Sequence, residues 1–277
     1  MLSIIIVHYD TAEELSACLD SLKSLPPNIE VVVVDNHSPT NPTDARFKVA
    51  EHPQMSWIDL PENLGFGGGV RRGVEAAKGD RLFFLNPDTR VGEVDWPGFI
   101  AEIEDDRVVC ADLKTEDNRR ELPGWFTPGL FSELARKLAQ GRIDRGMDWP
   151  ARILRRRGLK PGGLSWVTGA ALALTRSRWD RLGGFDPAFF LFFEDIDLCL
   201  RHRKEGGLCV ISKCIQVIHK RGVASGRHSE LAEHHYRQSQ EIFWARHGGW
   251  WSRHWMRLIV RVQRRRRVMR YHWRKRR

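Results

Sequence analysis

The chain has 277 residues and a mass of 32.1 kDa, and 42% of it is hydrophobic, which is enough for a large buried core and excludes global disorder. A formal net charge of +10 would by itself suggest a nucleic acid or an anionic membrane as partner. Of the 45 Lys and Arg, however, 13 fall in residues 246–277, which contain no Asp or Glu. Residues 1–245 therefore hold 32 basic and 35 acidic side chains, a net charge of −3.

Two short runs of β-branched apolar residues, Leu2–His8 and Ile29–Asp35, are typical of strands buried on both faces of a parallel sheet. Between them Thr11 and Glu14 have the spacing of a capping box, and leucines at helical spacing follow until Pro26-Pro27. These residues predict a βαβ unit at the start of the chain.

Apolar runs further along the chain predict the remaining strands. They occupy residues 56–60, 81–85, 107–112, 208–211 and 215–218, with regular structure also at 166–175. Helices are predicted after the glycine run, ending near residue 78, and from residue 194 to about 204. The expected fold class is α/β, with a mostly parallel central sheet.

Prolines interrupt amphipathic pieces over residues 118–161, which we interpret as an inserted, partly helical lid. We therefore predict that the chain consists of one domain over residues 1–228 and a helical, Trp- and Arg-rich basic tail over 229–277. The five cysteines contain no CxxC pair and fit free thiols in a reducing compartment. Residues 1–7 are too short for a signal peptide and no apolar stretch reaches about 18 residues, so we expect a cytoplasmic protein.

Polar residues end several of the predicted strands. Because ligands bind at the carboxyl ends of parallel strands, these residues form the candidate site. A carboxylate there hydrogen-bonds a ribose or base, and a second one holds a divalent cation on phosphates; Asp35 and Asp88 suit these roles. The alternative for each is an ordinary helix N-cap or turn residue.

The glycine run at residues 65–69 does not match a dinucleotide fingerprint, because Val70 stands where the last glycine belongs and the run lies far from the first strand. No GxxxxGK[ST] motif occurs either. An oxidoreductase and a P-loop NTPase are therefore disfavoured. The glycines either let the backbone approach a ligand closely or form a turn before a helix.

Eight short motifs follow one another between residues 8 and 219. They are His8-Tyr9-Asp10, Val34-Asp35-Asn36-His37-Ser38, Asn63-Leu64-Gly65-Phe66, Leu85-Asn86-Pro87-Asp88-Thr89, Gly169-Ala170, Gly183-Gly184-Phe185-Asp186, Phe193-Glu194-Asp195-Ile196-Asp197-Leu198 and Val217-Ile218-His219. Their order is that seen in family 2 glycosyltransferases, and the chain resembles the rhamnosyltransferase-like branch of that family over about residues 2–225. The resemblance implies an A-type glycosyltransferase fold with one nucleotide-binding domain.

The resemblance implies that Asp35 contacts the base or ribose of a nucleotide-sugar donor. The other donor-binding residues that it implies are His8, Tyr9, Asn36, Gly65, Arg71 and Asn86. Relatives often carry two Asn residues where this chain has Val70 and Arg71, and a guanidinium there could contact the diphosphate through two hydrogen bonds.

The resemblance also implies a divalent metal, Mg²⁺ or Mn²⁺, with Asp88 as a direct ligand and His219 completing the site. Such a metal bridges diphosphate oxygens and neutralises the charge on the leaving group. Asn86, in place of a first Asp, leaves fewer protein charges on the metal. The alternative for His219 is a strand-end histidine that makes an ordinary hydrogen bond.

By the same resemblance Asp195 is the general base that removes the acceptor hydroxyl proton, which suffices for an inverting displacement. Glu194, Gly169 and Trp166 are the expected acceptor-binding residues, although Trp166 equally fits core packing. Asp197 is more simply explained by the favourable charge of a carboxylate at a helix N-terminus.

The basic tail, residues 246–277, fits an interfacial helix on anionic lipid, because apolar residues fall on one helical stripe and arginines on the other side. The stripe consists of Trp251, Trp255, Leu258 and Val262. The alternative is a tail whose tryptophans pack on the protein's own body.

The preferred function is therefore an inverting, metal-dependent glycosyltransferase, peripheral on the inner face of the cell membrane, that acts on a lipid-linked or cell-envelope glycan. TDP-rhamnose, UDP-sugars and GDP-sugars remain open as donors, and no oligomeric state is predicted. A nucleic-acid-binding protein would explain the tail but none of the motifs. A non-catalytic sugar-nucleotide-binding module is the third alternative.

Overall fold

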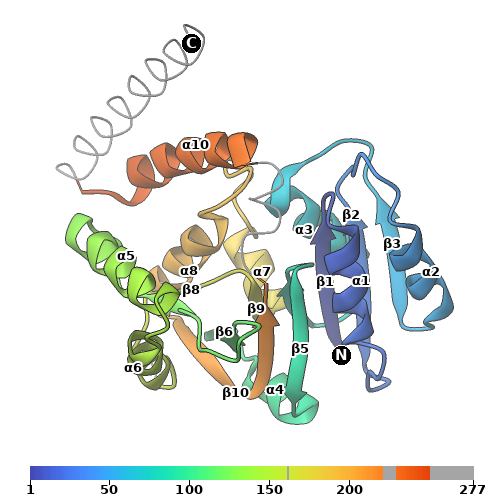
Figure 1. Ribbon diagram of the computed structural model, residues 1–277, viewed down its shortest axis with the longest axis horizontal. Helices are drawn as coiled ribbons and strands as arrows, with labels where there is room; N and C mark the ends of the chain where they lie inside the picture. The colour runs from blue at the N-terminus through green and yellow to red at the C-terminus, as the bar shows by residue number, and fades with distance from the viewer. Residues whose placement is uncertain (161, 221–228, 250–277) are drawn as a thin grey trace, which may run out of the picture.

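The computed structural model describes residues 1–160, 162–220 and 229–249, and an eight-stranded sheet runs through its centre (Figure 1). The strand order is β3-β2-β1-β4-β9-β6-β10-β5. Four of the seven adjacent pairs, β3-β2, β2-β1, β1-β4 and β6-β10, are parallel, so the mostly parallel α/β sheet predicted from the sequence is confirmed.

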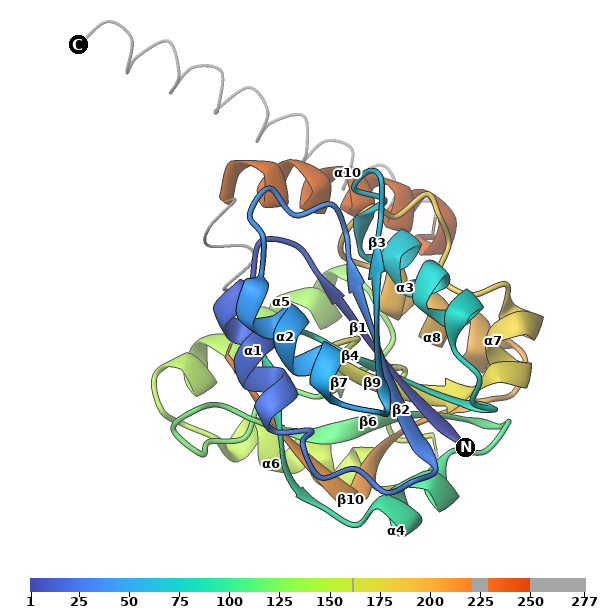
Figure 2. The same cartoon turned by 90° about the vertical axis from the view of Figure 1, so that its right-hand side faces the viewer.

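The first half of the sheet is wholly parallel. It consists of β1 (Leu2–His8), β2 (Ile29–Asp35), β3 (Met55–Asp59) and β4 (Arg81–Leu85). Helices α1 (Ala12–Asp20) and α2 (Thr43–Glu51) cover one face and α3 (Gly65–Ala76) covers the other (Figure 2). Every residue of β1 is consequently buried, as its continuous apolar sequence predicts.

The second half of the sheet is mixed. Strand β9 (Ala171–Thr175) is antiparallel to both β4 and β6 (Arg107–Lys114), and β5 (Thr89–Val94) is antiparallel to β10 (Leu208–His219). The two short strands predicted over 208–218 are wrong, because β10 is continuous and its pairing with β6 shifts register between Ile211 and Gln216. Strand β5 and helices α2 and α4 (Trp96–Glu102) were not predicted.

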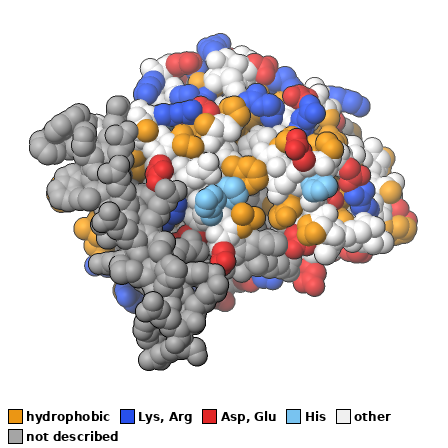
Figure 3. All heavy atoms as spheres, turned by 90° about the horizontal axis from the view of Figure 1, so that it is seen from above, with side chains coloured by type: hydrophobic (Ala, Val, Ile, Leu, Met, Phe, Trp, Pro, Cys, Tyr) orange, Lys and Arg blue, Asp and Glu red, His pale blue; other side chains and the backbone are white. Residues whose placement is uncertain are grey.

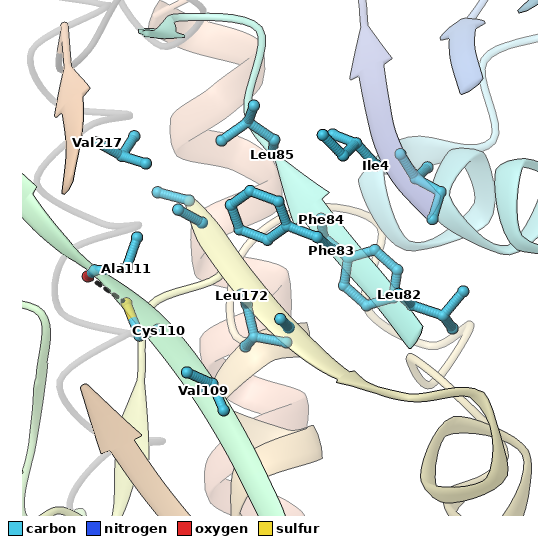
Figure 4. Packing of buried hydrophobic residues seen from close by; sticks show 14 of the residues in the cluster. Ile4, Leu82, Phe83, Phe84, Leu85, Val109, Cys110, Ala111, Leu172 and Val217 are labelled. Atoms are coloured by element: carbon cyan, nitrogen blue, oxygen red, sulfur yellow. Dashed lines mark hydrogen bonds between the residues drawn. The ribbon is translucent and has the colours of Figure 1, made fainter. Parts of the chain in front are cut away.

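The hydrophobic core lies along both faces of this sheet. Figure 4 shows Phe83 and Phe84 of β4 between Ile4 of β1 and Leu172 of β9, all of them fully buried. Truncating a buried phenylalanine to alanine typically costs about 3–5 kcal/mol, so these contacts contribute strongly to the stability of the sheet.

The capping box predicted at the start of α1 is wrong. Thr11 is the N-cap, but its side chain makes no capping hydrogen bond. Its hydroxyl instead lies 3.1 Å from Nδ1 of His8, at the end of β1. The threonine therefore orients a strand-end histidine.

The lid segment contains two helices, α5 (Leu130–Asp144) and α6 (Trp149–Gly158), which pack on each other at one end of the molecule (Figure 1). The short strands β7 (Gly124–Trp125) and β8 (Trp166–Val167) pair antiparallel, which brings together the chain before α5 and the chain after α6.

Helix α10 (Ser229–His247) packs against the domain, although the sequence division assigned it to the tail. Its Phe243 and Trp244 are buried in a cluster with Phe189, and the ring of Phe193 packs on it. His247 hydrogen-bonds Asp197 of α8 (Glu194–Lys204) at 2.7 Å, and helix α7 (Arg176–Leu182) precedes α8. No helix within the described ranges is long and apolar enough to span a membrane.

Candidate active site

A cavity of about 460 Å³ lies at the carboxyl ends of β1, β2 and β4, where the sequence places the candidate site. Residues from the lid and from α10 close its other side, and Figure 3, which looks onto the α10 side, shows histidine and hydrophobic side chains gathered on that face. Ten of the site residues predicted from the sequence line this cavity: Tyr9, Asn36, Gly65, Asn86, Asp88, Trp166, Gly169, Glu194, Asp195 and His219.

His8 and Asp35 lie beside this cavity but are buried and do not line it. The His8 Nε2 atom lies 3.8 Å from Asp35 Oδ1 and 3.1 Å from the Ser38 hydroxyl. Burial lowers the pKa of His8 despite the nearby charge of Asp35, so the ring is neutral at neutral pH. Asp35 accepts a hydrogen bond from the Ser38 backbone N–H at 2.8 Å.

Asn36 organises the loop that enters α3. Its Nδ2 donates to Asn63 Oδ1 at 2.9 Å and to the Gly65 carbonyl at 3.0 Å, while its Oδ1 accepts from the Leu64 N–H. Gly65 has φ +73°, and a Cβ atom there would come within 2.2 Å of the Phe190 carbonyl oxygen. Only glycine fits this position, and the glycine run begins α3 instead of forming a dinucleotide loop.

Arg71 does not line the cavity. Its guanidinium donates to the backbone carbonyls of Gly183 and Phe185 at 3.1 and 2.8 Å. These bonds tie α3 to the turn that follows α7.

Asp88 and His219 lie side by side at the edge of the cavity, with His219 Nε2 3.5 Å from Asp88 Oδ1. The other ring nitrogen, Nδ1, lies 3.1 Å from Oε2 of Glu121, a residue that the sequence analysis missed. Burial disfavours a charged His219, but its bonds to Asp88 and Glu121 outweigh burial and raise its pKa to about 9.

These side chains fit a divalent metal in part. An imidazole whose Nδ1 is held by a carboxylate is the arrangement that orients a histidine ligand, and a metal at Nε2 would have to displace the proton that the raised pKa keeps there. Over the described ranges, no three His, Cys, Asp or Glu side chains are grouped to hold a metal ion. Asp88 and His219 would therefore supply two ligands, and donor phosphates and water the others.

The carboxylates of Glu194 and Asp195 face the cavity from the first turn of α8. Asp195 Oδ2 accepts from the Gly169 N–H and Oδ1 from the Ile196 N–H, both at 2.7 Å. Burial nevertheless raises the pKa of Asp195. A Cβ atom on Gly169 would lie 3.0 Å from the Asp195 Cβ, so the small residue permits this contact.

Glu194 is 6% exposed, and its Oε2 has no hydrogen-bond partner among the described residues. Burial, together with the neighbouring Asp195 charge, raises the pKa of Glu194 well above its usual value. These raised pKa values favour a proton on one member of the Glu194-Asp195 pair, with the larger upward shift on Glu194. The preceding residues, Phe192 and Phe193, have φ of 69° and 70°, a strained backbone of the kind found at functional sites.

The lid and α10 contribute residues that the sequence did not single out. Arg136 lines the cavity from α5 and donates to both carboxylate oxygens of Glu133, at 2.9 and 2.6 Å. This bond raises the pKa of Arg136, which is thus a fixed positive charge facing the carboxylates. Tyr236 and His235 line the cavity from α10, and only the tertiary fold brings them there.

Comparison with known proteins agrees with this geometry. Residues 3–163 match the model of the family described as Glycosyl transferase family 2. The N-acetylglucosaminyl-diphospho-decaprenol L-rhamnosyltransferase of Mycobacterium tuberculosis is 28% identical over 284 residues, which is 91% of this chain and 86% of that protein. Rhamnosyltransferase WbbL of Escherichia coli is 22% identical over 73% of this chain and 76% of its own.

Among solved structures, the mannosyltransferase PcManGT of Pyrobaculum calidifontis, in complex with GDP-Man and Mn²⁺, superposes with a TM-score of 0.58 at 18% identity. The match covers 86% of this chain and 62% of that one, less than two thirds of its length. This likeness confirms the A-type glycosyltransferase fold expected from the sequence.

Proposed function

Because the chain belongs to glycosyltransferase family 2, its activity is glycosyl transfer, and we propose that it moves a sugar, with L-rhamnose the first candidate, from a nucleotide donor to a lipid-linked glycan of the cell envelope. The observation that carries this proposal is the Glu194-Asp195 pair in a cavity at the strand ends. The relative from Mycobacterium tuberculosis, whose name specifies a rhamnosyltransferase and a diphospholipid-linked N-acetylglucosamine, supports the choice of sugar and acceptor.

Asp195 is the general base in this proposal. Its carboxylate accepts the proton of the acceptor hydroxyl while that oxygen bonds to the anomeric carbon and the bond from that carbon to the nucleotide diphosphate breaks. One base and attack from the opposite face invert the anomeric configuration. The bonds from the Gly169 and Ile196 N–H groups hold the carboxylate still, and its raised pKa makes it a stronger base than an exposed Asp.

Glu194 contacts the acceptor in a different way. As a neutral carboxylic acid it donates a hydrogen bond to an acceptor oxygen, and it leaves the negative charge on Asp195. Trp166, which lines the same cavity from β8, offers an indole face for a sugar ring.

The donor-binding residues of the proposal lie around the β1, β2 and β4 ends. Tyr9 lines the cavity where the base or ribose would bind, and Asp35 would reach it from its buried position beside His8 only at its exposed edge. The Asn36-ordered loop at Gly65 brings backbone close to the phosphates in this proposal. Asn86 lines the cavity next to Asp88. Arg71, which bonds backbone carbonyls, acts on the donor only through the position of α3.

Asp88 and His219 would hold Mg²⁺ or Mn²⁺, and Glu121 would orient the imidazole. When bound, the metal supplies positive charge for the leaving diphosphate. The solved mannosyltransferase with Mn²⁺ supports the proposal of a divalent metal.

We also propose that the enzyme works at the inner face of the cell membrane. The predicted contact of residues 246–277 with anionic lipid lies largely outside the described residues, which end at 249. The nucleic-acid alternative is not favoured, because it would explain the basic tail but neither the family match over residues 3–163 nor the buried Glu194-Asp195 pair in the cavity. The buried pair of Glu194 and Asp195 in the cavity also disfavours a non-catalytic sugar-nucleotide-binding module.

The test is a donor panel with an N-acetylglucosaminyl diphospholipid of short chain as acceptor. TDP-rhamnose, UDP-sugars and GDP-sugars are each incubated with the enzyme and Mn²⁺, and products are identified by mass spectrometry. We expect one nucleotide sugar to yield a disaccharide lipid. If no donor yields a product while the protein binds none of the nucleotides by calorimetry, the proposal is wrong.

A further inference from the structure

Helix α5 exposes an apolar stripe on the side that faces away from the cavity. Phe131 is 85% exposed, and Leu134 and Leu138 are each more than half exposed. Their spacing of three and four residues places them on one side of the helix. Glu133 and Arg136 line the cavity from other positions, and Ala139 and Ile143 are buried. The stripe therefore has no partner within the described fold.

Helix α6 and the turn before it add three more exposed apolar side chains, Met147, Trp149 and Ile153. The opposite side of α6, including Ala151 and Leu154, is buried. Six of the nine large apolar side chains exposed in the described residues thus belong to α5, α6 and the turn between them. We call these six the lid face: Phe131, Leu134, Leu138, Met147, Trp149 and Ile153. Single exposed apolar residues are normal, whereas such a concentration marks an interaction surface.

The charge of the lid contrasts with that of the rest of the body. Residues 130–160 hold nine Lys or Arg against three Asp or Glu, a net of +6, while the remainder of residues 1–245 holds 23 against 32, a net of −9. Lys137, Arg145, Arg156 and Lys160 are exposed next to the lid face in sequence. The guanidinium of Arg142 lies over the ring of Trp149, 5.9 Å from its centroid. Exposed apolar and exposed basic side chains thus alternate along this segment of the chain.

We propose that the lid face docks onto an anionic lipid bilayer. Leu, Ile, Phe and Trp side chains enter the interface between headgroups and acyl chains, and the flanking Lys and Arg contact lipid phosphates. Charge complementarity argues against the chain's own tail as occupant, because residues 246–277 carry the same sign with 13 basic and no acidic residues. Nucleic acid satisfies the arginines but offers little surface that would bury three aliphatic side chains.

Docking in this orientation brings the active-site cavity to the membrane. The lid face and the cavity-lining Arg136 lie on different sides of one α-helix, whose diameter with side chains is about 10 Å. Docking through the lid face would therefore hold the cavity about one helix diameter from the bilayer surface. The docking surface itself does not depend on the proposed function.

A fluorophore on the lid face reports docking in the full-length chain. Leu138→Cys is labelled with an environment-sensitive dye in a Cys214→Ser background, because the other four cysteines are buried. The matched control is Phe47→Cys on α2, a position that is 60% exposed and outside the lid. Vesicles contain either phosphatidylcholine alone or phosphatidylcholine with phosphatidylglycerol. We expect a blue shift and about two-fold brighter emission at position 138 with anionic vesicles only, and no change at position 47.

Three results would overturn the proposal. They are no change at position 138, a change of equal size at positions 47 and 138, and emission at 138 that is already shifted without lipid, which would mean that another part of the chain covers the face. A shift produced by a single-stranded oligonucleotide and not by vesicles would assign the face to nucleic acid instead.

A second variant tests binding strength without a label. Phe131→Ser with Leu138→Ser should lower partitioning onto anionic vesicles by about ten-fold, whereas Phe47→Ser should not change it. Equal partitioning of the wild type, the double variant and Phe47→Ser would contradict the proposal. Because these assays measure no sugar transfer, their outcome is separate from that of the donor panel.

Discussion

The strand ends of the parallel half of the sheet and the α5–α6 lid use apolar and charged residues in opposite ways. In β1, β2 and β4 the apolar side chains are buried and the polar residues that end the strands lie at or beside one cavity. In the lid, Phe131 and Trp149 face outward among basic residues. The first arrangement holds buried polar atoms in fixed orientations, as catalysis requires. The second exposes an apolar and basic surface, as binding to another surface requires.

This contrast also predicts how each region responds to substitution. A buried hydrogen-bonded carboxylate has one productive position, so the loss of a single atom is severe. A docking surface distributes its binding over several side chains, so single losses are mild. Similar losses from substitutions in the two regions would contradict this contrast.

Asp195→Asn should cause the largest loss. We expect kcat to fall by about 10³-fold because the amide cannot accept the proton, while donor affinity stays within about three-fold. Initial-rate kinetics and calorimetry with the nucleotide sugar measure the two quantities. Asp59→Asn, an exposed carboxylate paired with Arg46, is the control. Turnover of Asp195→Asn near the wild-type rate would remove this residue from the base role.

Asp88→Asn or removal of divalent metal should lower activity by about 10²-fold, and Glu121→Gln, which releases the His219 ring, by about ten-fold. The readout that distinguishes a metal from a purely structural role is donor binding, which should strengthen on addition of Mn²⁺ in the wild type and not in Asp88→Asn. The idea is untenable if EDTA changes neither rate nor donor affinity.

The rate should fall on the acid side by about ten-fold per pH unit, because protonated Asp195 is not a base. Burial raises the pKa of Asp195 above the usual Asp value, so this fall should begin at a higher pH than for an exposed carboxylate. A profile of kcat against pH, with folding checked by circular dichroism, measures it. A rate independent of pH down to 4 would contradict a raised pKa.

Phe131→Ser with Leu138→Ser should lower transfer to an acceptor embedded in anionic vesicles by about ten-fold relative to a detergent-soluble acceptor of short chain. The ratio of the two rates isolates docking from catalysis. Equal loss of both activities would mean that the lid face takes part in catalysis, which would contradict the contrast between the two regions.

Glu194→Gln should have the smallest effect, a change in kcat of less than about three-fold. Burial and the Asp195 charge raise the pKa of Glu194, which favours its protonated form, and glutamine has the shape of that form and still donates a hydrogen bond. Steady-state kinetics beside Asp195→Asn provide the comparison. A loss as large as that of Asp195→Asn would mean that Glu194 acts as a carboxylate.

Sequence patterns predicted those parts of the molecule that local physics determines. The strand Arg81–Leu85 and the helix Glu194–Lys204 have the predicted bounds, because apolar runs and a first turn rich in acids are local signals. The strand-end rule also placed Asp88 and Asn86 at one cavity.

Residues that reach the site through the tertiary fold could not be predicted in this way. Glu121 contacts His219 across 98 positions of sequence, and Arg136 and Tyr236 reach the cavity from helices outside the sheet. The predicted capping box at Thr11 fails for a local reason, since His8, three positions earlier, takes up the threonine hydroxyl. No local pattern signals the contacts that Glu121, Arg136 and Tyr236 make.

The role of Asp195 in sugar transfer is tested most directly by measuring product from the wild type and from Asp195→Asn, side by side, with one nucleotide sugar and a soluble lipid-diphosphate N-acetylglucosamine acceptor. We expect a single disaccharide lipid from the wild type and about 10³-fold less from a variant that still binds the donor. Equal product from the two proteins, or donor binding by the wild type without any product, would contradict this role.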